Sequence, residues 1–275
     1  FSDIRIGIQL SHAGRKSSAR SPRSGGRGPL TPDDGAWQTV APSAVPLGAN
    51  WHTPAALDAV GRAKVVDDFV QAARRADRIG ADAIELHAAH GYLLSSFLSP
   101  IANVRTDEYG GSLQNRMRFP LEVFEAVRAV WPREKALGVR INGTDWVYGG
   151  ITPEEAAVFA GELDARGCDF IDVSSGGNAP ASIPLHTGYQ VPFAAAVRQA
   201  VTIPVMAVGL IRTAEDAQRV LDDGHADLIG VGRGHLHNPH WTWEAAEDLG
   251  TSVPVPYQYA RAATRAGRPV ERYVK

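Results

Sequence analysis

The sequence predicts an α/β fold, a (β/α)8 TIM barrel, on three observations. Short apolar segments typical of buried strands alternate with segments of helical periodicity, which predicts a parallel sheet. A unit of helix, glycine, aspartate and apolar strand recurs at residues 80–84, 167–171 and 224–229. Polar residues gather after the strands, where barrel enzymes keep their active sites, and this favours a barrel over a doubly wound sheet.

Six strands can be counted in chain order. Each is a short apolar segment; they begin at Ile4, Ala83, Leu137, Phe170, Pro204 and Leu228. A closed barrel needs about eight strands. We therefore expect the first two strands of the barrel to be absent from this chain, which opens on Phe1 and enters a strand within four residues.

Helices are predicted between the strands. Apolar residues at helical spacing predict one over 66–79, which Gly80 ends, and another over 119–127. Thr152, followed by proline and two glutamates, is typical of a helix start, and this helix should end at Gly167. Thr213 and Asp216 should open the last one, which ends at Gly224.

Composition indicates one domain over residues 1–275. The chain is 44% hydrophobic and 21% charged, enough for a sizeable core, and its net charge of -2 argues against nucleic acid as a partner. No apolar run approaches membrane-spanning length, and no export leader opens the chain. The single cysteine, Cys168, fits a reducing compartment and buried packing. We expect a cytoplasmic protein.

Residues 11–60 form a long loop-like segment rich in serine, glycine and proline. A loop of this length in a compact domain is usually functional or disordered. Because Trp37 and Trp51 lie within it, we favour a partly ordered flap over the site rather than a mobile excursion. Residues 252–275 are expected to form a C-terminal tail.

The most informative stretch is residues 83–92, a short strand that ends in His87, His90 and Tyr92. Titratable groups at the C-terminal end of a strand lie where α/β barrels place their chemistry. The two histidines could be zinc ligands, a pair that stabilises an oxyanion, or a structural pair, and their spacing alone does not decide among these.

Further residues point to a phosphate-bearing ligand. Gly209 and Gly232 follow the last two strands, where barrels often bind phosphate through backbone N–H groups, and Arg233 adds a forked cation. The alternative is a pair of tight turns with an exposed arginine. Arg140 should point inward from its strand and need an anion, and the amide of Gln9 could bind a ring or neighbouring backbone.

Three motifs together resemble the Old Yellow Enzyme family of flavin oxidoreductases. They are QLSHAGR from Gln9, HAAHGY from His87, and RTDEYGGS from Arg105 with the asparagine and arginines that follow. The resemblance covers essentially the whole chain. The histidine pair resembles the thermophilic-like bacterial ene-reductase branch.

The resemblance implies an FMN-containing barrel that takes hydride from NADPH or NADH and reduces an alkene activated by a carbonyl or nitro group. It implies that His87 and His90 bind the substrate oxygen and that Tyr92 donates the proton. By the same resemblance Gln9 and Arg140 contact the flavin, whereas Gly209, Gly232 and Arg233 hold its phosphate; these five are the expected cofactor-binding residues. The Tyr109 motif is expected to be structural scaffolding with some access role.

Arg261 resembles an arginine that reaches a neighbouring subunit's active site, which implies a homodimer or homotetramer. The residues after Arg261 continue to Lys275, further than is usual in this branch. Two alternatives stay open: a chain with this fold that does not retain FMN, and a zinc enzyme, for which no third ligand is evident. A larger dienoyl reductase relative is excluded, because its iron–sulfur cluster requires grouped cysteines.

Overall fold

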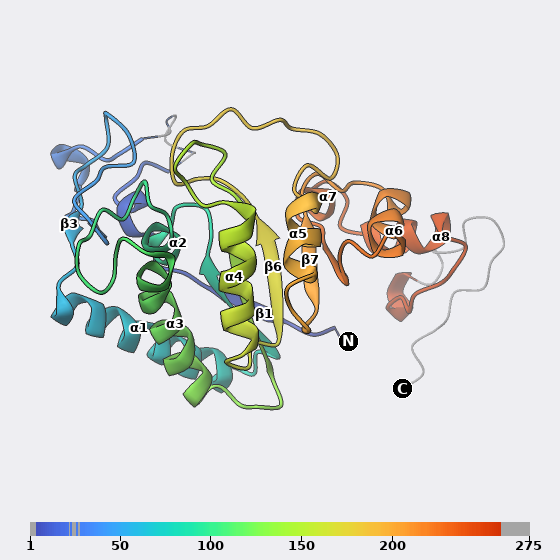
Figure 1. The fold of residues 1–275 in the computed structure, drawn as a ribbon. Helices are drawn as coiled ribbons and strands as arrows, with labels where there is room; N and C mark the ends of the chain where they lie inside the picture. Colours follow the sequence, from blue (N-terminus) through green and yellow to red (C-terminus); the bar gives the residue numbers. More distant parts are fainter. Residues whose placement is uncertain (1–3, 22, 24–25, 27, 260–275) are drawn as a thin grey trace.

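The computed structural model describes residues 4–21, 23, 26 and 28–259. Their main sheet has six parallel strands in chain order, curled into a partial barrel whose two edges are the first and last strands (Figure 1). The strands are β1 (Gly7–Leu10), β4 (Ala83–Ala88), β5 (Ala136–Asn142), β6 (Phe170–Ser174), β7 (Val205–Val208) and β8 (Leu228–Gly230). The predicted α/β barrel architecture and its six strands are confirmed.

Helices follow most of the strands and cover the outside of the sheet (Figure 1). They are α1 (Ala59–Arg78), α2 (Leu93–Leu98), α3 (Leu113–Val130), α4 (Pro153–Asp164), α5 (Val191–Arg198), α6 (Ala214–Asp222), α7 (Arg233–His237) and α8 (Trp241–Asp248). Short elements complete the described chain: the 3-10 turns η1 (Gly14–Lys16), η3 (Pro32–Asp34) and η4 (Tyr257–Tyr259), and the paired strands β2 (Val40–Ala41) and β3 (Ala55–Ala56).

The caps expected from the sequence are formed. The Thr152 side chain accepts a hydrogen bond from the Glu155 N–H at the start of α4, and Thr213 does the same for Asp216 at α6. Positive φ angles of 80° at Gly167 and 69° at Gly224 let the chain leave these two helices. The threonine caps and the glycines that predicted the limits of these two helices are thus present in the structure.

The two faces of the sheet have different roles. The outer face carries Ile84, Leu86, Leu137, Val139 and Ile171, each at most 2% exposed, and these side chains pack against the helices as the hydrophobic core. The inner face carries polar side chains instead. Strand register places His87 opposite Arg140 and Arg140 opposite Asp172, so one polar row crosses three strands.

Described residues of the segment over 11–60 are held by the loop that follows α2. The Arg105 guanidinium donates to the carbonyls of Pro42 and Leu57, and the Ser43 hydroxyl accepts from the Val104 N–H. Trp37, one basis for expecting a flap, is 54% exposed. Closure of this segment over the site stays a prediction.

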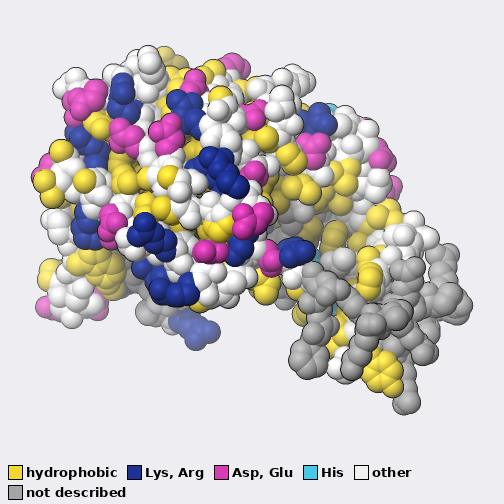
Figure 2. All heavy atoms as spheres, turned by 90° about the horizontal axis from the view of Figure 1, so that it is seen from below, with side chains coloured by type: hydrophobic (Ala, Val, Ile, Leu, Met, Phe, Trp, Pro, Cys, Tyr) yellow, Lys and Arg dark blue, Asp and Glu magenta, His cyan; other side chains and the backbone are white. Residues whose placement is uncertain are grey.

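Figure 2 shows one face of the molecule on which positive and negative side chains alternate, without a broad basic patch. Among the described helices none has the length and apolar character needed to span a bilayer.

Candidate functional site

The site is built around the loop between β4 and α2. His90 adopts a φ of 60° and Gly91 a φ of 71°, so the chain turns sharply at the strand end. A Cβ on Gly91 would lie 2.1 Å from the Gly177 carbonyl oxygen, because this loop packs directly against the loop that follows β6. In Figure 1 the β6 arrow points toward that long loop, which arches over the same end of the sheet.

The two histidines contact each other edge to face. His87 Nε2 and His90 Nδ1 are 3.2 Å apart, and the ring centroids are 4.9 Å apart. His87 is only 5% exposed, and the Asn142 side chain accepts a hydrogen bond from the His90 backbone N–H. The pair that the sequence placed at one strand end is therefore a single hydrogen-bonded unit.

The contacts around the pair assign its protons. The Ala89 N–H donates to His87 Nδ1, so the ring hydrogen of neutral His87 is on Nε2 and points at His90 Nδ1. His90 Nε2 then donates to the Ser174 hydroxyl at 2.7 Å. Ser174 in turn donates to the side-chain oxygen of Gln190. These hydrogen bonds form a chain in which each group donates to the next, from β4 to β6 and on to the start of α5.

Both imidazoles are neutral at neutral pH. Burial lowers the pKa of His87 to about 4, with nearby Arg140 and Lys16 adding to the effect. Burial, followed by the charge of Arg140, lowers the pKa of His90 to about 3. The pair therefore offers one N–H donor, His90 Nε2, without a positive charge of its own.

Tyr92 stands beside the pair at the N-cap position of α2. Its ring lies 4.9 Å from the His87 ring, also edge to face. The Lys16 ammonium lies 5.5 Å from the centroid of the Tyr92 ring and donates to the His90 carbonyl at 2.5 Å. The structure thus brings the three predicted catalytic residues together and adds Lys16, for which the sequence analysis predicted no role.

A charged cluster lies next to the pair on the inner face of the sheet. Arg140 Nε is 3.2 Å from an Asp172 carboxylate oxygen, and Gln9 donates to Glu85 at 2.5 Å. Burial raises the pKa of Asp172 to about 7, against the opposing effect of Arg140. Arg140 points inward as predicted, and part of the anion it needs is supplied by the protein itself.

A pocket of about 640 Å³ opens from this cluster toward the ends of β7 and β8. Its walls bring together His90, Arg140, Gly209, Gly232 and Arg233, which the sequence analysis had placed in two separate groups. Gln9 is absent from its walls as described and lies on β1, hydrogen-bonded to Glu85. Arg261 lies outside the described residues.

Several contributors to the site were missed in the sequence. Asn142 and Ser174 bond to His90 from 52 and 84 residues along the chain, and Gln190 in turn accepts from Ser174. Lys16 could have been suspected from its place directly after the motif that begins at Gln9. The other three give no local signal, because their importance comes from the register of β4, β5 and β6.

The Tyr109 motif forms a scaffold away from the histidines. Arg105 pairs with Asp107, Tyr109 donates to Glu122 at 3.0 Å, and the Arg62 guanidinium lies 3.9 Å from the Tyr109 ring centroid. These contacts agree with the structural role expected for it. Cys168 is 3% exposed, and burial raises the pKa of its thiol to about 12.

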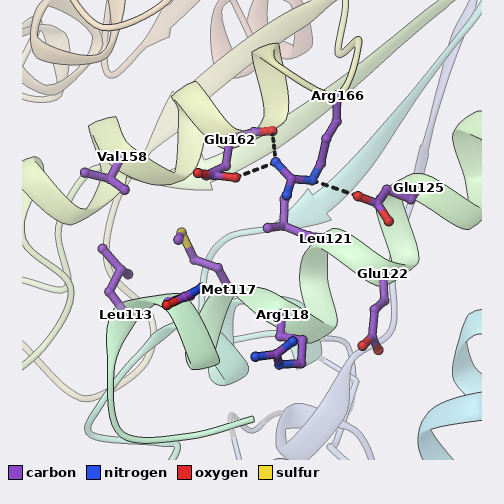
Figure 3. Close-up of a pocket in the computed structure, with 10 residues that line it drawn as sticks. Leu113, Met117, Arg118, Leu121, Glu122, Glu125, Val158, Glu162 and Arg166 are labelled. Atoms are coloured by element: carbon purple, nitrogen blue, oxygen red, sulfur yellow. Dashed lines mark hydrogen bonds and ion pairs between the residues drawn. The ribbon is translucent and has the colours of Figure 1, made fainter. Parts of the chain in front are cut away.

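A second hollow, of about 510 Å³, lies on the outside of the barrel between α3 and α4 (Figure 3). There Arg166 forms ion pairs with both Glu125 and Glu162. No strand end contributes to it. Within the described part of the chain, no group of three or more histidine, cysteine or carboxylate side chains is arranged to hold a metal.

Comparison with known proteins gives a consistent result. Residues 2–252 match the NADH:flavin oxidoreductase / NADH oxidase family. An NADPH dehydrogenase of Geobacillus thermodenitrificans is 43% identical over 93% of this chain and 70% of its own length. One of Listeria innocua is 42% identical over 95% of this chain and 72% of its own length.

Solved structures share the fold. Morphinone reductase superposes with a TM-score of 0.71 at 33% identity, over 90% of this chain and 66% of that protein. An Old Yellow Enzyme homologue of Zymomonas mobilis gives 0.71 at 26%, over 91% of this chain and 69% of that protein. A 2-naphthoyl-CoA reductase gives 0.75 at 23% identity, over 89% of this chain and 38% of that protein, which shows likeness of fold.

Proposed function

The chain belongs to the NADH:flavin oxidoreductase / NADH oxidase family, and from this premise we propose that it is an FMN-dependent ene-reductase. It takes hydride from NADPH or NADH and reduces the C=C bond of small-molecule alkenes activated by a carbonyl or nitro group. The observation that carries the proposal is the neutral His87–His90 pair with Tyr92 at its side, next to a pocket that reaches Arg140 and Arg233.

The residues of the pocket fit FMN. Arg140 Nε is buried and makes no aligned hydrogen bond, so it can donate to an electron-rich ring edge. No atom would contact a Cβ on Gly232 within 4 Å, so a phosphate can approach this backbone closely. Arg233 is exposed and forms no ion pair among the described residues. Gln9 stays a proposed flavin contact; to bind the flavin, its side-chain amide would give up its hydrogen bond to Glu85.

The chemistry that bound FMN supplies is hydride storage and transfer. In the proposed mechanism the oxygen of the activating group accepts the His90 Nε2–H in place of the Ser174 hydroxyl, and His87, which donates its own N–H to His90, holds His90 in position. Negative charge that grows on this oxygen is stabilised by an N–H donor already held in place. Tyr92 transfers its phenolic proton to the alkene carbon that does not receive hydride. One hydride and one proton complete the reduction.

The remaining parts of the proposal concern the whole protein. We place it in the cytoplasm and expect a homodimer or homotetramer in which Arg261 reaches a neighbouring site. The buried thiol of Cys168 agrees with a reducing compartment. Sedimentation of wild type and Arg261→Ala at micromolar concentration measures the oligomeric state, and shows whether the assembly forms without Arg261.

The experiment that tests the cofactor is FMN uptake. The purified chain is incubated with FMN, desalted and examined for visible absorption, alongside Arg233→Ala and the exposed control Arg74→Ala on α1. Retained flavin in wild type and control, with at least about tenfold weaker affinity in Arg233→Ala, supports the proposal. A colourless wild type would favour the alternative of a family member that does not retain FMN.

A further inference from the structure

Two carboxyl groups and one guanidinium form a charged cluster on the inner face of the sheet. Arg140 on β5 lies opposite Asp172 on β6, and its Nε is 3.2 Å from an Asp172 carboxylate oxygen. Glu85, on the neighbouring strand β4, lies near enough for its charge to act on Asp172 and to be acted on by Arg140. With both carboxyls ionised, the cluster has two negative charges and one positive charge.

Of the two carboxyl groups, Asp172 is the one less able to stay ionised. Glu85 accepts a hydrogen bond from the Gln9 amide at 2.5 Å, which stabilises its charged form. Asp172 is only 5% exposed, and its Oδ1 atom has no hydrogen-bond partner among the described residues. A buried carboxylate without hydrogen-bond donors gains stability when it is protonated. Asp172 is therefore the group of this cluster that exchanges a proton.

The strands on both sides of Asp172 determine where it titrates. Arg140 is the facing cation and Glu85 the facing acid, whereas His87 on β4 is neutral at neutral pH. Strand β7 places Met206, which does not titrate, opposite Asp172. Burial, opposed by Arg140 and reinforced by Glu85, raises the pKa of Asp172 to about 7. A small change in the surrounding charge is enough to alter the protonation of this carboxyl at neutral pH.

Arg140 connects this carboxyl to the proposed cofactor site. Its side chain lines the pocket of about 640 Å³ that fits FMN, and the same guanidinium is paired with Asp172. Bound FMN gains one negative charge when it accepts a hydride. Because an added negative charge raises the pKa of a nearby carboxyl, Asp172 should hold a proton more tightly when the flavin is reduced.

We propose that Asp172 is a redox-linked proton site, which takes up a proton from solvent when bound FMN is reduced and releases it when the flavin is reoxidised. The proposal rests on the ene-reductase function and adds a residue that acts on the cofactor through Arg140. The hydride adds one negative charge to the flavin, and the proton removes one from Asp172, so the net charge of the site is unchanged. Protonated Asp172 leaves the charge of Arg140 to the reduced flavin.

The test measures the midpoint potential of bound FMN against pH. Dithionite and reference dyes are used, so the result does not depend on turnover of NADPH or of an alkene. Between about pH 7 and 8.5 wild type should take up two protons for each pair of electrons, one on the flavin and one on Asp172. Asp172→Asn should take up only one, so its potential should vary about half as steeply with pH in this range.

Two further variants distinguish Asp172 from its surroundings. Asp223→Asn, at an exposed carboxyl just after α6, should keep the wild-type slope. Glu85→Gln should keep the second proton, but the steep range should begin at a lower pH, because loss of the Glu85 charge lowers the pKa of Asp172.

Infrared difference spectra of wild type give a readout that does not require a variant. Reduction at about pH 8 should produce the C=O stretch of a protonated carboxyl, identified by its shift in D2O. Asp172→Asn should lack this band, which assigns it to Asp172.

The outcomes separate this inference from the proposed function. Uptake of one proton by wild type over the whole range, or loss of the second proton in Glu85→Gln but not in Asp172→Asn, would overturn the inference and leave the ene-reductase intact. Failure to reduce an enone, with the two slopes as expected, would overturn the proposed reaction alone. A chain that takes up no FMN would overturn both.

Discussion

His87 Nε2 donates to His90 Nδ1 across 3.2 Å, and the direction of this bond is set by the Ala89 N–H, which occupies the other nitrogen of His87. The bond leaves His90 Nε2 as the terminal donor of the pair, and Ser174 accepts it. A substrate oxygen can take the place of Ser174 without any change of tautomer. Preorganisation of this kind keeps reorganisation small when charge develops on the substrate.

Replacement of both histidines by alanine should separate flavin binding from ligand binding. FMN should stay bound, because Gly209, Gly232 and Arg233 are untouched, whereas enone reduction and phenol affinity should fall by about 100-fold or more. Reduction rates and phenol titrations measure both, with His225→Ala, in the loop before β8, as the control. Unchanged phenol affinity in the double variant would remove the pair from the substrate site.

The same histidines should make stability depend on pH. Their pKa values are lowered from 6.5 to about 4 and about 3 in the folded chain, so the unfolded chain binds more protons as pH falls below 6.5. The free energy of unfolding should therefore fall between pH 6.5 and 4.5, by on the order of 1–2 kcal/mol for each histidine. Asp172, whose pKa is raised to about 7, acts in the opposite sense in this window.

Comparison of wild type with the double alanine variant isolates the histidines, because Asp172 is present in both. Urea unfolding at several pH values should show that acidification destabilises wild type more than the variant. Parallel pH curves for the two chains would contradict the buried, neutral state of the pair.

Asp172 should tune the flavin through Arg140. Its carboxylate lies 3.2 Å from Arg140 Nε and offsets part of the charge that would stabilise a reduced, electron-rich ring. Asp172→Asn should raise the midpoint potential of bound FMN, measured by anaerobic titration with reference dyes. The exposed control Asp223→Asn should leave it unchanged, and a lowered potential in Asp172→Asn would show that Arg140 does not act on the flavin.

Gly91 should tolerate no side chain. Gly91→Ala combines a positive φ of 71° with a Cβ only 2.1 Å from the Gly177 carbonyl oxygen. Gly149→Ala is the matched control, because Gly149 has a φ of 73° and open space around it. We expect about 1–2 kcal/mol of destabilisation in the control and clearly more in Gly91→Ala, by thermal and urea unfolding. Equal losses of unfolding free energy in the two variants would mean that the loops after β4 and β6 separate easily to admit the Cβ.

Local chemistry predicted most of the fold. The alternation of Ile84 and Leu86 with Glu85 and His87 predicted the two faces of β4: the first two lie in the hydrophobic core, whereas Glu85 and His87 bond to polar side chains. Helix α2 was missed, because it is six residues long and buried on every side, so it shows no helical periodicity in polarity. Helix α5 was missed as well, within a stretch rich in glycine and proline.

Only the part of the site formed by residues close in sequence could be predicted. His87, His90 and Tyr92 are neighbours in sequence, and their proximity follows from one strand and one turn. Ser174 and Gln190 reach the pair only through the order and register of the strands, which a single sequence does not display. Lys16 reaches it through the packing of η1 on α2, a contact between segments 77 residues apart (from 16 to 93).

The most direct measurement is a visible absorption spectrum of the FMN-loaded chain under nitrogen, taken before NADPH, after NADPH and again after cyclohexenone. An FMN-dependent ene-reductase should bleach with NADPH and recover its yellow colour as the enone is consumed. A bound flavin that bleaches but recovers only when air is admitted would contradict alkene reduction. A flavin that NADPH does not bleach would contradict the proposed oxidoreductase as a whole.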